Sequence, residues 1–125
     1  MAIQSRRLIS EDKNMIIAAR NLMSRSSLGE RQIDVSIYAP ELVDGTWICR
    51  YKIDWPTQKR ESFAAGVDSV QALCLALQKI GMELYVSPYH LSGDLRWEKF
   101  GDGYGFPVPK NGRDMLVGAD KAFEG

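Results

Sequence analysis

His90 is the only histidine in the chain and the residue whose type best suits acid–base chemistry near neutral pH. Two carboxylates, Asp94 and Glu98, follow it closely, and a histidine that a carboxylate orients can act as a general base. These three residues form the candidate catalytic set. A surface histidine near the end of a helix, where positive charge is mildly stabilising, explains the same pattern without catalysis. The sequence favours this second interpretation.

The two cysteines, Cys49 and Cys74, are candidates for a reactive thiolate or for metal ligands. A catalytic thiolate needs an electropositive and partly exposed pocket, whereas both cysteines fall among apolar residues and are expected to be core thiols. A structural zinc site needs four ligands, commonly Cys and His, and 2 Cys with 1 His fall one short. We expect no metal and two reduced, inaccessible thiols.

A glycine-rich run from Gly101 to Phe106 raises the question of a phosphate loop. The dinucleotide fingerprint G-x-G-x-x-G precedes a helix. This run reads G-x-G-x-G and leads into Pro107 and Pro109, so no helix follows it directly. Tight turns with close backbone packing explain the glycines better, and we expect no cofactor.

The composition places these residues in one globular domain, 1–125. The chain has 125 residues, of which 45% are hydrophobic and 26% charged, which is ordinary for a folded domain. Its formal net charge is +0, so the basic surplus typical of nucleic-acid binding is missing. No apolar run is long enough to span a membrane, and the N-terminus lacks a secretory signal. We therefore expect a cytoplasmic protein that binds neither nucleic acid nor membrane.

Periodicity predicts an α+β fold. An N-terminal helix over 10–24 is expected from the Ser10 cap and an apolar arc. Alternating or short apolar runs predict a three-stranded antiparallel β-meander over 31–39, 46–55 and 59–65. A long amphipathic helix over 69–86 should pack on this sheet, capped by Asp68 and burying Leu73, Leu77, Ile80 and Leu84. A short fourth strand over 95–100 precedes an irregular tail over 101–125.

Several of these segments resemble a known family. They are the run W-I-C-R-Y-K-I over 47–53, the run F-A-A-G-V-D-S-V-Q-A-L over 63–73, the run A-L-Q-K-I-G over 76–81 and the run G-Y-G-F-P over 103–107. Together they resemble a small bacterial family, domain of unknown function 6968, over the core 31–109. Residues 10–29 look like a helical insertion or extension relative to that pattern. The resemblance implies no activity and no functional residue.

The apolar arc of the 10–24 helix needs a cover, either within the chain or on a second copy. A symmetric helix pair would bury this arc in a homodimer. Aromatic residues beyond those needed for a small core mark a further interface. The candidate interaction residues are Met15, Ile16, Leu22, Met23, Trp97 and Tyr104.

No constellation of residues in the chain specifies a reaction. The sequence therefore favours a non-catalytic protein-interaction or accessory module of the immunity type, with a protein partner that it does not identify. The alternative is a small enzyme that uses His90 with Asp94 or Glu98 as its acid and base. A concave pocket that holds His90 and a carboxylate would favour the enzyme, and an exposed apolar patch would favour the interaction module.

Overall fold

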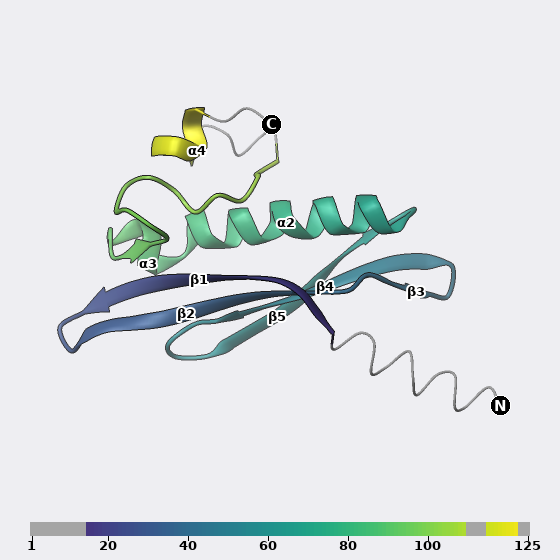
Figure 1. The fold of residues 1–125 in the computed structure, drawn as a ribbon, viewed down its shortest axis with the longest axis horizontal. Coiled ribbons are helices and arrows are strands. Elements are labelled where there is room, and N and C mark those ends of the chain that lie inside the picture. The colour runs from purple at the N-terminus through teal and green to yellow at the C-terminus, as the bar shows by residue number, and fades with distance from the viewer. Residues whose placement is uncertain (1–14, 110–114, 123–125) are drawn as a thin grey trace.

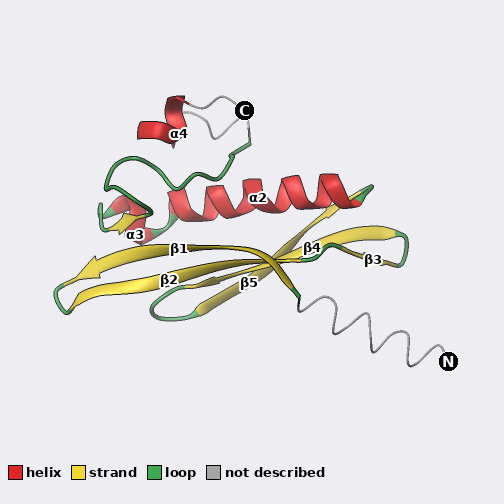
Figure 2. Ribbon diagram, viewed as in Figure 1, coloured by secondary structure: helices red, strands yellow, loops and turns green. Residues whose placement is uncertain are grey.

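The protein is a single antiparallel sheet with one long helix on one of its faces (Figures 1 and 2). The computed structural model describes residues 15–109 and 115–122. The strands are β1 (Ile16–Ser26), β2 (Gly29–Tyr38), β3 (Glu41–Val43), β4 (Thr46–Asp54), β5 (Lys59–Gly66) and β6 (Leu95–Arg96). The helices are α2 (Ser69–Val86), α3 (Pro88–Leu91) and α4 (Gly118–Ala122).

The strand order follows from the pairings along β4. One side of β4 pairs with β5 along its whole length, and the other side pairs first with β3 and then with β2. β2 continues to β1, and β1 pairs briefly with β6. In the described part of the chain, β5 is thus one edge of the sheet. The other edge consists of β1 with the two-residue β6 and, alongside the start of β4, of the short β3.

The predicted N-terminal helix is wrong. Residues 16–26 form β1, which pairs with β2 from Ile16↔Tyr38 to Ser26↔Gly29, and residues 10–14 lie outside the described residues. The segment carries two competing periods, because Arg20, Leu22 and Ser24 also alternate with Asn21 and Met23. A weak helical period gives way where a neighbouring strand offers a full ladder of hydrogen bonds.

The predicted three-stranded meander is also wrong, since the sheet has 6 strands. β1 adds a strand before the meander, and β3 adds a short strand where Pro40 interrupts the path from β2. The strand expected over 95–100 is confined to Leu95–Arg96. Strand is therefore the main element of the fold, and α2 is the one long helix among the described residues.

The helix α2 forms where its sequence pattern predicts it. Asp68 caps it, since its side chain accepts a hydrogen bond from Gln71 N at 2.8 Å, and Pro88 follows its end. Its inner side buries Ala72, Ala76, Ile80, Leu84 and Tyr85 in one core with Ile33, Val35, Ile37, Cys49, Tyr51 and Ile53 from the sheet. Leu73 and Leu77, also expected in this core, are only partly buried.

The residues after β6 do not form a loose tail. They return to α2 (Figure 1) and also contact β1, since the Tyr104 carbonyl accepts a hydrogen bond from Arg20. Tyr104, Phe106 and Val108 are buried there. Gly81 makes this packing possible, because a Cβ at this position would fall on the carbonyl oxygen of Pro107. None of the helices within 15–109 and 115–122 is long and apolar enough to cross a membrane.

Candidate functional site

The side chain of Asp120, in α4, holds the glycine-rich run against α2. Its carboxylate accepts hydrogen bonds from the Tyr85 hydroxyl at 2.7 Å and from the backbone N–H groups of Tyr104 and Gly105, each at 2.8 Å. Gly103 and Gly105 have positive φ angles of 85° and 77°, which favour glycine. A Cβ on Gly103 would collide with the Asp120 carboxylate. The run G-x-G-x-G is therefore a turn built around a protein carboxylate.

The ring of His90 joins the same cluster. Its Nδ1 lies 2.5 Å from the Tyr104 hydroxyl, and the ring also makes an edge contact with Tyr85. Burial lowers the pKa of His90 from its usual range. Burial is also the main cause of the raised pKa values of the Tyr85 and Tyr104 hydroxyls. These groups are therefore kept neutral in a packed cluster.

The structure does not bring the predicted catalytic set together. Asp94 is bonded to Arg25 at 3.2 Å and to Ser92 at 2.8 Å, and Glu98 acts as a charge neighbour of Arg20. The His90 ring has a tyrosine as its hydrogen-bond partner instead of a carboxylate. Asp120, which the sequence analysis missed, is separated from Tyr85 by 35 positions, and no local pattern signals that contact.

Three of the predicted interaction residues belong to the interior of the chain. Leu22 is 0% exposed and Tyr104 3% exposed. Trp97 lies beneath the Arg20 guanidinium, 3.8 Å from ring centroid to Cζ, while Arg20 donates to the Tyr104 carbonyl at 3.0 Å. Met23 is partly buried. Only Met15 and Ile16 remain open to solvent, at 56% and 52% exposed.

One open groove lies at the end of the sheet between the β1–β2 hairpin, the β4–β5 turn and α3. We call it the end groove, and its volume is about 760 Å³. A smaller hollow of about 270 Å³ shares Thr57, Pro88 and Tyr89 with it. Between the two, Tyr89 stacks on Trp55 with ring centroids 4.9 Å apart and planes 12° apart. Tyr89 thus contributes an aromatic ring to the lining of the end groove, and Trp55 fixes its position.

The charges of the end groove are mostly paired. Arg25 pairs with Asp94, and Glu30 pairs with Arg96 at 2.7 Å. Arg31 is exposed and has no ion pair or hydrogen bond within the described residues. Hydroxyl groups of Ser24, Ser26, Thr57 and Ser92 lie along the groove. This lining is suited to binding, because it holds no unpaired acid or base except the permanently charged Arg31.

The two thiols differ in environment. Cys49 is buried, its Sγ lies 3.5 Å from the Tyr38 carbonyl, and burial raises its pKa to about 11. Cys74 is exposed on α2, so the expectation that both thiols are inaccessible is wrong for Cys74. Within 15–109 and 115–122 there is no group of three or more His, Cys, Asp or Glu side chains that could hold a metal ion.

Comparison with protein-family models shows to which family this chain belongs. The model of DUF6968, a domain of unknown function, matches residues 18–108. The chain belongs to the DUF6968 family. The match extends the predicted core, 31–109, toward the N-terminus, so that residues 18–29 and most of β1 lie within it. Neither the curated proteins nor the solved structures gave a match.

Proposed function

We propose that this DUF6968 chain is a non-catalytic interaction module that binds an extended, acidic segment of a partner protein in the end groove. The observation that carries the proposal is the composition of that groove. It combines the ring of Tyr89, which Trp55 backs from the neighbouring hollow, with a row of hydroxyl groups, while its carboxylates are engaged in ion pairs. Aromatic platforms with a few polar groups are typical of peptide-binding grooves.

The positive charge of Arg31 indicates that the partner segment is acidic. The other three charged residues of the end groove compensate one another or a neighbour, so Arg31 is left to pair with a ligand. A guanidinium binds a carboxylate through two parallel hydrogen bonds. The preferred segment therefore carries an aspartate or glutamate, together with an apolar or aromatic side chain that packs against Tyr89.

An enzyme built on His90 is not supported by the geometry. His90 lines neither the end groove nor the smaller hollow beside it, and its ring is hydrogen-bonded to a buried tyrosine. A cytoplasmic location is part of the proposal, since Cys49 and Cys74 are free thiols and reducing compartments preserve thiols.

The test uses a displayed library of random linear peptides as the probe and the full chain as the target. Selected peptides should be rich in acidic and aromatic residues. Removal of the aromatic platform in Tyr89→Ala, or reversal of charge in Arg31→Glu, should weaken their binding about tenfold, which corresponds to about 1.4 kcal/mol. Lys52→Glu, on a partly buried β4 residue outside the groove lining, is the matched control and should leave the affinity unchanged.

Thermal unfolding of each variant checks that the fold is intact. If the library yields no binding peptide, or if the selected peptides bind Arg31→Glu and Tyr89→Ala as tightly as the original chain, the end groove is not the binding site and the proposal is overturned.

A further inference from the structure

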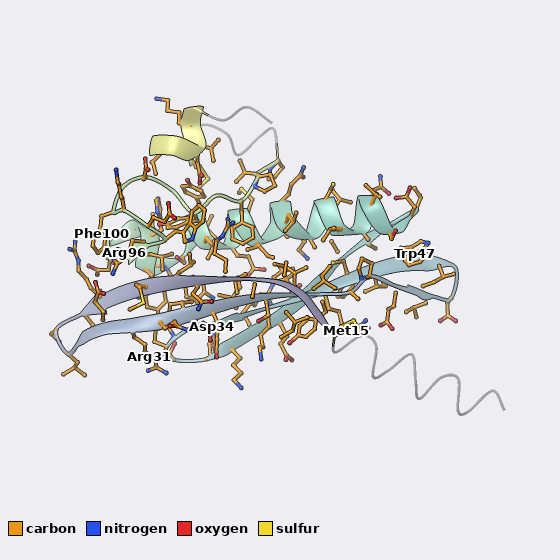
Figure 3. The ribbon with its side chains drawn as sticks, viewed as in Figure 1. Met15, Arg31, Asp34, Trp47, Arg96 and Phe100 are labelled. Atoms are coloured by element: carbon orange, nitrogen blue, oxygen red, sulfur yellow. The ribbon has the colours of Figure 1, made fainter. Side chains whose placement is uncertain are left out.

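We propose that the free edge of β1 is a self-association surface, where a second copy of this chain adds its own β1 in antiparallel orientation. Two sheets would then become one continuous sheet across a two-fold axis. This proposal concerns a different surface from the end groove. Figure 3 shows Met15 and Arg31 well apart along the sheet, so each proposal can fail without the other.

The backbone of β1 presents unused hydrogen-bonding groups at this edge. The Arg25 N–H points outward, because it donates to the Asp94 carbonyl at 3.0 Å. The pairing of β1 with β2 is regular from Ala18 to Ser26, and N–H groups alternate along a strand. The N–H and C=O groups of Ala19 and Asn21 therefore also point outward. Within the described chain, β6 covers only the positions of Met23 and Ser24.

The side chains at the start of β1 have the character of an interface. The five residues Met15 to Ala19 are uncharged and all exposed, with Met15, Ile16 and Ile17 at 56%, 52% and 46%. Proteins normally protect an exposed edge strand with charges, proline or a very short length. Met15 to Ala19 carry no charge and no proline, and their one irregularity is the bulge between Ile16 and Ala18. An apolar edge that is unpaired within the described chain is a site for pairing with another strand.

The opposite edge of the sheet, β5, is protected against the addition of another strand, in contrast to β1. In β5, the Phe63 carbonyl is capped by the Lys79 ammonium group at 2.7 Å, and Lys59, Arg60 and Glu61 place three charges in a row on that strand. Charged side chains of this kind discourage strand addition. The sheet is therefore closed to pairing at β5 and open to it at β1.

A second copy is the occupant that this edge fits best. An antiparallel β1–β1 pair with the two Ala19 residues opposite each other places Arg20 opposite Ala18 of the second copy, so it brings no like charges together. The nearest charge, Arg20, is held away from the edge by the Tyr104 carbonyl and the Trp97 ring. A two-fold pair also uses up both β1 edges. Among the described strands it leaves outside the protected β5 edges and the edges of β3, which is only 3 residues long, so that the assembly stops at two copies.

The test compares two proline variants of the full chain by light scattering. Ala19→Pro removes an outward N–H that no residue within 15–109 and 115–122 uses, so it should block association while the chain stays folded. Ala18→Pro removes an N–H that points toward β2, so it should destabilise the fold. The original chain should show about twice the mass of 14.1 kDa at micromolar concentration, and Ala19→Pro should show the single mass.

A second variant and a second measurement test the β1 pairing independently of the proline substitution. Ile17→Lys places like charges where the two β1 strands would pair, and it should also give a folded monomer. Hydrogen exchange should show protected Ala19 and Asn21 amides in the original chain and fast exchange in Ile17→Lys. A monomeric original chain overturns the proposal, even if those amides are protected, because another segment of the same chain then covers the edge. A dimer that survives both Ala19→Pro and Ile17→Lys overturns it as well.

Discussion

At the scale of single residues, His90 makes the stability of the fold depend on pH. Burial lowers its pKa in the folded state, whereas the unfolded chain has an ordinary imidazole that titrates near ~6.5. The unfolded state therefore binds the proton first as the pH falls. The contribution of His90 is fully present above about pH 6.5 and is lost as the pH drops below it.

Urea unfolding between about pH 7.5 and 5 measures this effect. The free energy of unfolding should fall with pH in the original chain and should fall less steeply in His90→Gln. The slope is the readout, because the substitution also removes the contact with Tyr104 and lowers stability at every pH. Parallel curves for the two proteins would show that His90 does not titrate differently in the folded state.

The thiols give a second prediction at this scale. Cys74 is exposed and Cys49 is buried with its pKa raised to about 11, and only a thiolate attacks a disulfide reagent rapidly. A chromogenic disulfide reagent should modify one thiol per native chain quickly and the second only after denaturation. Cys74→Ser should remove the fast phase, and Cys49→Ser should keep it. A fast phase in Cys74→Ser would place Cys49 at the surface.

At the scale of elements, the contact between α2 and the segment after β6 depends on Gly81. Replacing glycine by alanine in a helix interior normally stabilises it by about 1 kcal/mol. Here the new Cβ would fall on the Pro107 carbonyl and lie 3.1 Å from Val108 Cγ1. We expect Gly81→Ala to destabilise the fold by about 1–3 kcal/mol, as measured by denaturant unfolding.

Val70→Ala is the matched control in the same helix, because Val70 is exposed and should change stability by no more than about 0.5 kcal/mol. A Gly81→Ala variant that is more stable than the original chain would mean that residues 107–108 do not pack on α2.

The elements also differ in how well the sequence predicts them, for physical reasons. The bounds of α2 follow from local signals, since Asp68 caps its start and Pro88 cannot continue it. β1 has no such signals. Its two large apolar residues between Ala18 and Ser24, Leu22 and Met23, suit a helix and a strand equally well, and the pairing with β2 decides the outcome. The local sequence pattern of β1 cannot predict a conformation that depends on pairing with another strand.

At the scale of the whole molecule, the candidate sites also depend on contacts between residues that are far apart in the sequence. Met15 and Ile16 were predicted as interaction residues from the apolar arc of a 10–24 helix. Residues 16–26 form a strand instead, and Met15 and Ile16 are exposed. The clamp of Asp120 on Tyr85 and the stack of Tyr89 on Trp55 join positions 35 and 34 apart. These contacts form only when α2 packs on β4 and β5 and the chain after β6 returns to α2. Residue type alone identifies side chains that can act, whereas the fold selects which of them meet.

The single core shared by α2 and the sheet makes Leu22 a test of the whole fold. Leu22 is 0% exposed within one chain, so no second copy is needed to cover it. Leu22→Glu would place an uncompensated charge in this core, and such a charge costs about 3–5 kcal/mol. We expect Leu22→Glu to lower the free energy of unfolding by this amount, or to prevent folding. Met23→Glu, at the neighbouring position that alternates toward the uncovered face, should cost no more than about 1 kcal/mol. Urea unfolding of both variants measures the difference, and a Leu22→Glu chain as stable as Met23→Glu would show that β1 does not contribute to the core.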